Sequence, residues 1–228
     1  MITKIFQIAT FGTFRADNIL TGLKVYPSQR LALICYEHDN SNAKRFLKVI
    51  RSIDENIEII MCQTSRQNII ENVFGYFGRM VGSGSEINRY QRVLVNVSSG
   101  DKPLSYSVLC AAYIKGIETF MINSNNFSNR LAVIPTPKSY YDKIITKTNL
   151  RILNSIARAE GVVYGLDQLQ RLSGLIKPLL SYHINGRDNT KGLIDLGLVS
   201  VENRKYEDGT IVIVRLTAIG KLFVTNRK

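Results

Sequence analysis

The feature that most constrains the fold is a regular alternation, over the first 122 residues, of short apolar runs with longer stretches of helical periodicity. The apolar runs are rich in Val, Ile and Leu, and their length is typical of strands. Strands that alternate with helices favour a parallel sheet covered by helices on both faces. The predicted strands are residues 2–9, 30–36, 57–62, 91–97 and 119–122, and the predicted helices are residues 16–23, 41–53, 66–81 and 103–115.

The second half of the chain has a different rhythm. Residues 148–160 carry apolar positions at helical spacing, with Thr148 as the predicted N-cap and Gly161 as the stop. The pattern continues with a helix over residues 167–172, a helix that begins near Lys177 and Pro178, a hairpin of strands 198–202 and 211–216 that turns at Asp208-Gly209, and a closing helix 218–224 capped by Thr217. Three helices, a hairpin and a closing helix are the elements of a winged helix-turn-helix.

A polar, turn-prone segment at residues 123–130 and the Pro135-Thr136-Pro137 sequence separate the two halves. The boundary is therefore expected between residues 135 and 146. We predict a Rossmann-like α/β domain over residues 1–138, followed by a winged helix-turn-helix domain over residues 139–228.

The net charge of +12 is unevenly distributed. Residues 1–142 hold 16 Lys and Arg against 11 Asp and Glu, whereas residues 143–228 hold 14 against 7. A basic domain attracts polyanions at long range, so this surplus favours nucleic acid as a partner. A charge surplus that serves only solubility is the alternative.

Three cysteines, Cys35, Cys62 and Cys110, are far apart and lack the spacing of a metal site, so we expect buried, reduced thiols and no bound metal. No run of about 18 apolar residues predicts a membrane span. Residues 1–9 lack the pattern of a secretory signal. These observations predict a cytoplasmic protein without a membrane partner.

One loop in the first half has the composition of a phosphate site. A predicted strand delivers Asn96, the chain turns through Ser98, Ser99 and Gly100, and a helix opens directly after Lys102. Ligands of open α/β sheets bind at the carboxyl ends of strands, and free N–H groups at a helix start favour anions. The loop lacks the Walker and GxGxxG patterns, so neither nucleotide hydrolysis nor a dinucleotide cofactor is indicated. An ordinary strand-to-helix turn is the alternative.

The first predicted strand ends in a second such loop. Thr10 and Thr13 supply hydroxyls, and Gly12 supplies backbone that a ligand can approach closely. We expect the two loops to converge at one edge of the sheet.

A first strand that ends in a Thr/Gly loop, with a later strand that ends in N-x-[ST]-[SG]-G-x-K, resembles the CARF domain of CRISPR-associated proteins. The C-terminal half resembles the winged helix-turn-helix of archaeal CRISPR-associated transcriptional regulators. The resemblance implies a homodimer that binds a cyclic oligoadenylate, such as cyclic tetra-adenylate, across its two-fold axis. Asp101 departs from the family pattern, which often has Thr there. The ligand-binding residues it implies are Thr10, Phe11, Gly12, Thr13, Asn96, Ser98, Ser99, Gly100 and Lys102.

The segment 175–199 resembles the recognition region of winged-helix regulators, with an insertion at residues 185–191 in which Gly186 is expected to end the helix. Leu180 and Ile184 are expected to face the core, and His183 is either a packing residue or a contact. The predicted DNA-binding residues are Lys177 and Arg187 for phosphates, Ser181, Tyr182 and Asn185 for base edges, and Arg204 and Lys205 on the wing.

The resulting hypothesis is a DNA-binding transcriptional regulator of CRISPR-related genes, controlled by a cyclic oligoadenylate and acting in antiviral defence. A ring nuclease that cleaves the ligand, or a regulator that senses another nucleotide or metabolite, are the alternatives. We assign no catalytic residue.

Overall fold

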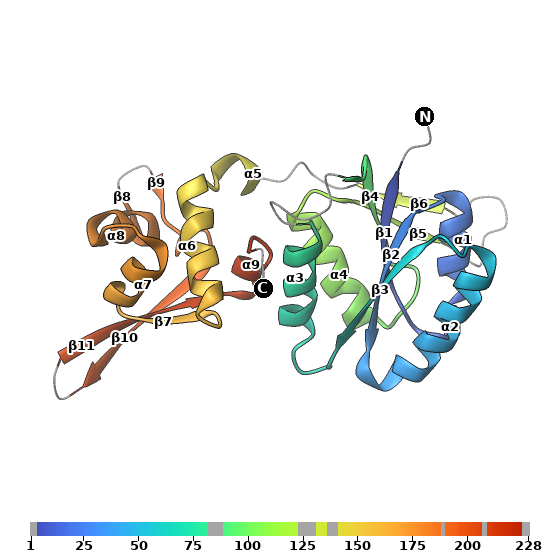
Figure 1. The fold of residues 1–228 in the computed structure, drawn as a ribbon, viewed down its shortest axis with the longest axis horizontal. Helices are drawn as coiled ribbons and strands as arrows, with labels where there is room; N and C mark the ends of the chain where they lie inside the picture. Colours follow the sequence, from blue (N-terminus) through green and yellow to red (C-terminus); the bar gives the residue numbers. More distant parts are fainter. Residues whose placement is uncertain are drawn as a thin grey trace.

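The computed structural model describes residues 4–81, 89–122, 131–135, 141–187, 190–206 and 209–224. A six-stranded sheet forms the centre of the N-terminal half, in the order β3-β2-β1-β4-β5-β6 (Figure 1). The first five strands are parallel, and β6 runs antiparallel beside β5. The strands are β1 Ile5–Thr10, β2 Arg30–Tyr36, β3 Glu58–Thr64, β4 Arg92–Asn96, β5 Glu118–Ile122 and β6 Leu131–Ile134. The predicted Rossmann-like, mostly parallel sheet is confirmed.

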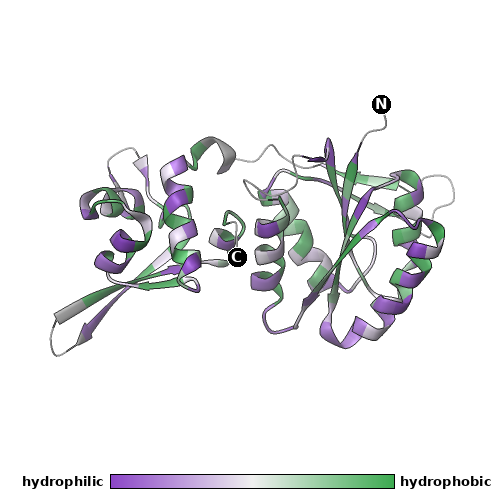
Figure 2. Cartoon of the chain, viewed as in Figure 1, coloured by the Kyte–Doolittle hydropathy of each residue, from purple (hydrophilic) through white to green (hydrophobic). Residues whose placement is uncertain are grey.

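Helices cover both faces of this sheet (Figure 1). Helices α1 (Asp17–Val25) and α2 (Asn40–Ile53) pack on one face, around a core that includes Leu31 and Leu33. Helices α3 (Ile69–Val81) and α4 (Lys102–Ile114) pack on the other face. Figure 2 shows hydrophobic residues concentrated along the strands, as burial on both faces requires. Two single-turn helices, η1 (Thr13–Arg15) and η2 (Glu37–Asp39), follow β1 and β2.

The C-terminal half is a small helical and antiparallel unit. Its three-stranded sheet has the order β10-β11-β7. Its helices are α5 Tyr141–Ile144, α6 Lys147–Arg158, α7 Leu166–Ser173, α8 Lys177–Asn185 and α9 Ala218–Lys221. Its strands are β7 Val162–Tyr164, β10 Val199–Tyr206 and β11 Gly209–Leu216, with a separate two-stranded ladder of β8 Gly186–Arg187 and β9 Thr190–Lys191.

Several sequence predictions need correction. The N-cap of α6 is Thr146 and not Thr148, because the Thr146 hydroxyl accepts from the backbone N–H of Asn149 at 3.1 Å. Strands β6 and β7 were not predicted, and the closing helix is shorter than expected. Cys35 and Cys62 are buried, but Cys110 is exposed on the outer side of α4. The junction predicted between residues 138 and 139, the segment 123–130 and Asp208 lie outside the described residues.

No helix in the described part of the chain is long and apolar enough to cross a membrane. The same part of the chain contains no cluster of three or more His, Cys, Asp or Glu side chains suited to a metal ion.

The two halves share one continuous hydrophobic core. The chain after α9 lies against α3, and a methyl group on Gly78 would lie 2.2 Å from the Lys221 carbonyl oxygen and 3.0 Å from that of Val224. Phe223 is buried; the Lys115 ammonium lies 4.2 Å from its ring centre. The absent side chain of Gly78 therefore sets how closely the C-terminal segment approaches the N-terminal domain.

This contact predicts opposite effects for two glycines of one helix. Gly78→Ala should lower the free energy of unfolding by about 1–3 kcal/mol, because backbone carbonyls must move away from the new methyl group. Gly75→Ala should be neutral or stabilising by about 0.5–1 kcal/mol, because its Cβ meets only the Arg79 guanidinium, at 3.6 Å. Urea denaturation measures both. Equal stability of the two variants would contradict the close contact.

Candidate functional site

The loops that follow β1 and β4 meet at the carboxyl edge of the sheet, where the strand order reverses. The backbone N–H of Gly12 donates to the Ser99 hydroxyl at 2.9 Å, and that hydroxyl donates to the Gly12 carbonyl at 3.0 Å. The Thr10 hydroxyl donates to the Ser99 carbonyl. A Cβ on Gly12 would lie 2.7 Å from the Cα and N of Gly100, so the two backbones touch where both residues lack side chains.

A second set of buried polar groups holds the β4 loop in shape. The Asn96 side-chain oxygen accepts from the Ser98 backbone N–H at 3.0 Å and from the Ser98 hydroxyl. The Ser98 hydroxyl in turn accepts from the Ile122 N–H at 2.6 Å, which joins the loop to β5. Thr10, Asn96, Ser98 and Ser99 are all buried. Their polar groups bond the protein itself, so their predicted contact with a ligand stays a prediction.

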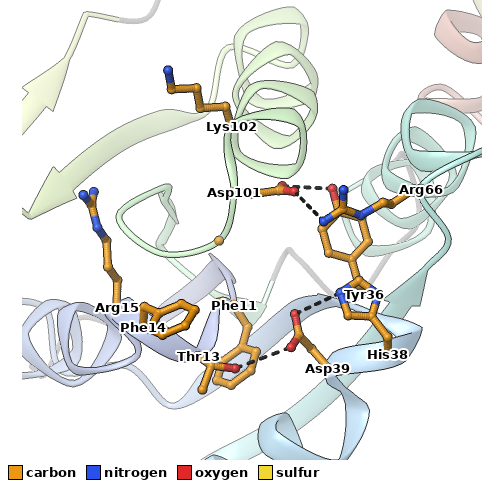
Figure 3. A pocket seen from close by; sticks show the side chains of 12 residues that line it. Phe11, Thr13, Phe14, Arg15, Tyr36, His38, Asp39, Arg66, Asp101 and Lys102 are labelled. Carbon is orange, nitrogen blue, oxygen red and sulfur yellow. Dashed lines mark hydrogen bonds and ion pairs between the residues drawn. The ribbon is translucent and has the colours of Figure 1, made fainter.

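Above these loops lies an open cavity of about 570 Å³ (Figure 3). Five of the predicted ligand-binding residues line it: Phe11, Gly12, Thr13, Gly100 and Lys102. Seven further residues that line the cavity were not predicted as ligand-binding: Phe14, Arg15, Tyr36, His38, Asp39, Arg66 and Asp101. The positive side chains are those of Arg15, Arg66 and Lys102, against the carboxylates of Asp39 and Asp101.

The aromatic side chains of this cavity differ in burial. The Phe14 side chain is fully exposed, at 103% of its reference area, and it projects beside the cavity. Tyr36 is buried at 3%, and its ring stacks on that of His38 with centres 5.1 Å apart. The hydration of an exposed phenylalanine ring is unfavourable, and covering the ring with an apolar partner is favourable. Phe14 therefore offers a surface suited to a planar apolar group.

Asp101 organises one wall of the cavity. It is the N-cap of α4, and its carboxylate accepts from the Leu104 backbone N–H at 3.0 Å. The same carboxylate accepts from the Tyr36 hydroxyl at 2.9 Å and pairs with the Arg66 guanidinium at 3.5 Å (Figure 3). Arg66 also lies over the Tyr36 ring, 5.2 Å from its centre. Asp101 thus positions a tyrosine and an arginine.

The positions of Tyr36 and Arg66 in the cavity follow from the strand order of the sheet. Tyr36 ends β2, the strand beside β1, and Arg66 follows β3 by two residues. Tyr36 at the end of its strand and Arg66 just beyond its strand therefore both lie at the carboxyl edge, where ligands of open α/β sheets bind. Phe14 and Arg15 lie on the single turn after Gly12, just beyond the predicted motif.

The predicted DNA-binding residues lie on α8, on the ladder that follows it and on β10. Leu180 and Ile184 are buried as predicted, and Gly186 ends α8 with a φ of 76°. His183 is half-buried, its Nδ1 lies 2.6 Å from the Asn149 side-chain oxygen, and burial lowers its pKa. His183 is therefore hydrogen-bonded to Asn149 of α6.

The polar groups on α8 and β10 differ in how they are paired. Lys177 pairs with Asp167 at 2.5 Å, and the Asn185 amide donates to the Ser181 hydroxyl at 3.1 Å. Arg204 pairs with Glu202 at 3.1 Å. The remaining members of the set, all exposed, are Tyr182, Arg187 and Lys205.

Neither a protein-family model nor a curated protein matches this chain. Its structure is distantly similar to three solved structures, each with a TM-score below 0.5. Can2 from Sulfobacillus thermosulfidooxidans, in complex with cyclic tetra-adenylate, has 15% identity and a TM-score of 0.42 over 75% of this chain and 58% of its own. Enterococcus italicus Csm6, bound to cyclic hexa-2'-fluoro-hexa-dAMP, has 16% identity and a TM-score of 0.47, and the coverage is 77% and 52%.

The third is protein VC1899 from Vibrio cholerae, with 12% identity and a TM-score of 0.44 over 96% of this chain and 66% of its own. This chain thus spans between 52% and 66% of the length of these three chains. The similarity is structural and distant, and it assigns neither a family nor a ligand.

The contacts between Asp101, Tyr36 and Arg66 predict an unusual titration of Tyr36. Burial and the hydrogen bond to the Asp101 carboxylate raise the pKa of Tyr36 to about 12, because both oppose a phenolate. NMR of ¹³Cζ-tyrosine, with Tyr36→Phe for assignment, should show Tyr36 protonated where an ordinary tyrosine, with a pKa of about 10, is half ionised. Asp101→Asn, which keeps a capping side chain, should lower the pKa.

The same raised pKa has a consequence for stability. The contribution of Tyr36 to the free energy of unfolding is fully present below the pKa of a tyrosine in the unfolded chain. This contribution is lost as the pH rises from about 10 towards about 12. A Tyr36 resonance that titrates like the other tyrosines, in both the wild type and the Asp101→Asn variant, would contradict the hydrogen bond.

Proposed function

We propose that this chain is a ligand-controlled DNA-binding regulator, whose N-terminal domain senses a cyclic oligoadenylate in the cavity above the Gly12 and Gly100 loops. The observation that carries the proposal is the combination, in one open cavity, of three cationic side chains, close backbone at two glycines and a fully exposed Phe14. Phosphate groups and planar bases are the two chemistries that such a lining fits.

Each part of a nucleotide has a partner there. Arg15, Arg66 and Lys102 lie on different walls and supply charge-assisted donors for several phosphates. The glycine backbones let a phosphate approach more closely than a Cβ would allow. Phe14 offers a free face for a base. A ligand with several phosphates and bases uses more of this lining than a single nucleotide, which supports an oligonucleotide.

The CARF resemblance supports two further parts of the proposal, a cyclic ligand and a homodimer. In that arrangement a cyclic oligoadenylate such as cyclic tetra-adenylate lies across a two-fold axis and contacts the same residues in both subunits. The cavity is open, which is compatible with a ligand shared between two copies.

The C-terminal unit supports DNA binding by its order of elements. Helices α7 and α8 are joined by the three residues 174–176, and Gly174 adopts a left-handed conformation with a φ of 65°. A short turn with glycine between two helices is typical of a helix-turn-helix. In that role α8 enters the major groove, and the β10–β11 hairpin, with Arg204 and Lys205 exposed, is the wing.

A physical path joins the cavity to this unit. Arg66 lies three residues before the start of α3, whose Gly78 contacts the carbonyls of the C-terminal segment. A ligand that moves Arg66 acts on the start of α3, and the close contact at Gly78 passes a shift of α3 to the DNA-binding unit. A ligand that binds one dimer arrangement better than another then changes the spacing of the paired α8 helices, which must match about 34–36 Å on B-DNA.

Ligand binding is tested with two charge deletions. Lys102→Ala and Arg66→Ala should each weaken the binding of cyclic tetra-adenylate about 10- to 100-fold by calorimetry, because each removes a charge-assisted hydrogen bond of about 1.5–3 kcal/mol. Lys44→Ala, on the exposed side of α2 outside the cavity, is the control and should bind like the wild type. Unchanged affinity in both cavity variants would remove the proposed site. Linear product in excess of protein would favour the ring-nuclease alternative.

DNA binding is tested by its salt dependence. The logarithm of the association constant for a palindromic promoter fragment should fall steeply with the logarithm of the salt concentration, because Lys and Arg release counterions from phosphates. Lys205→Ala should reduce that slope by about 1. A flat salt response, or a slope equal to that of the wild type in Lys205→Ala, would contradict the assigned wing contact.

A further inference from the structure

A second, smaller pocket lies between the C-terminal turns of helices α1 and α2. The segment directly before β2 and residue Ile57 directly before β3 complete its lining. The pocket therefore lies at the amino-terminal edge of the sheet, opposite the edge that carries the cavity above the Gly12 and Gly100 loops. Figure 1 shows α1 and α2 at the end of the molecule away from the C-terminal unit. The proposed function makes no use of this pocket.

The walls of this pocket are mostly aliphatic, and they enclose a volume of about 190 Å³. Ile50 and Ile57 are buried, whereas the Ile53 side chain is 63% exposed. Covering an aliphatic side chain that is this exposed with an apolar group is favourable. The aliphatic lining residues are Leu20, Leu23, Pro27, Ile50, Ile53 and Ile57.

Four polar side chains complete the lining, and three of them bond the protein itself. The Ser28 hydroxyl donates to a backbone carbonyl at 2.8 Å, and the Gln29 side-chain oxygen accepts from a backbone N–H of β1 at 2.7 Å. The Asp54 carboxylate accepts from the backbone N–H two residues further on, at 3.0 Å. The fourth is Lys24, whose ammonium has no ion pair or hydrogen bond with any residue that the structure describes. The pocket thus combines an aliphatic interior with one available cation.

We infer that this pocket binds a small apolar monocarboxylate, whose apolar body lies against the aliphatic walls and whose carboxylate pairs with Lys24. A cavity of about 150 Å³ with such walls holds a benzene molecule, so about 190 Å³ suits a body of about six to ten carbon atoms. A carboxylate is the natural partner of a single ammonium. The inference goes beyond the proposed function and does not depend on it.

The charge of the lining separates this ligand from that of the larger cavity. The cavity has a volume of about 570 Å³ and three cationic side chains, whereas the pocket has about 190 Å³ and one. Asp54 also lies in the pocket lining and disfavours a second negative charge on the ligand by repulsion. An oligonucleotide is therefore too large and too highly charged for the pocket.

A series of straight-chain acids tests the size of the pocket on the unmodified chain. Methyl NMR should show saturable binding of octanoate, with the shifted resonances concentrated at Leu20, Leu23, Ile50 and Ile53. From butanoate to octanoate the dissociation constant should fall about two- to fourfold per methylene, because each added methylene is buried. The gain should stop beyond about ten carbon atoms, because the pocket is then full.

Two results of this series would overturn the inference. Shifts spread over the whole surface would mean that octanoate has no defined site. An affinity that keeps rising through dodecanoate and tetradecanoate would indicate an open surface for long acyl chains, such as those of lipids, in place of a closed pocket for a free acid.

Charge reversal tests the contact with the carboxylate. Lys24→Glu should weaken octanoate binding about three- to tenfold, because a repulsion replaces an attraction between exposed groups. Octan-1-ol, which has the same chain length and no charge, should bind the wild type and Lys24→Glu equally. Lys44→Glu, at an exposed position of α2 outside the pocket, is the matched control and should bind octanoate like the wild type. Octanoate binding that Lys24→Glu leaves unchanged would contradict the assigned contact.

A polar substitution in the wall tests the apolar contact. Ile53→Ser should weaken octanoate binding about three- to tenfold, because the chain loses an aliphatic neighbour. Val49→Ser removes a side chain that is 46% exposed on the same helix outside the pocket, and it should bind octanoate like the wild type. Both positions are exposed, so both variants should fold. Equal affinity in the two variants would place the octanoate chain elsewhere and overturn the site.

Discussion

The contact between the loops after β1 and β4 is the constraint on which the rest of the site depends. The Ser99 hydroxyl bonds both the N–H and the carbonyl of Gly12, and Gly12 touches Gly100 backbone to backbone. These bonds satisfy groups that are buried and would otherwise cost free energy. They also fix the floor of the cavity, because Gly12 and Gly100 carry no side chains that would hold the two loops apart. The cationic and aromatic lining is arranged around this floor.

The buried polar side chains of the two motifs and the charged side chains of the cavity have separate tasks in this structure. Thr10, Asn96 and Ser98 lie inside and shape the loops. Arg15, Arg66 and Lys102 line the cavity. Asp101 connects the loop after β4 with the cavity lining, because it caps α4 and its carboxylate bonds Tyr36 and Arg66. Arg66, which lines the cavity, precedes α3, the helix against which the C-terminal segment packs.

The parts predicted from the sequence are those with a strong local signal. Alternating apolar runs and helices predicted the parallel sheet, and glycine-containing loops after two strands predicted an edge site. Strand β7 has three residues and β6 has four, which is too short for a pattern to stand out. Thr146 and Thr148 are both able to cap α6, and only the bond to Asn149 identifies the first. Tyr36 and Arg66 are distant in sequence from both motifs, so their place in the cavity needed the strand order.

The most direct measurement of the central claim is a crystal structure of the full chain grown with cyclic tetra-adenylate. The account predicts ligand phosphates within hydrogen-bond distance of Lys102 and Arg66, above an unchanged contact between Gly12 and Gly100. A ligand bound elsewhere on the chain with the cavity unchanged, or two loops that separate in the crystal, would contradict it.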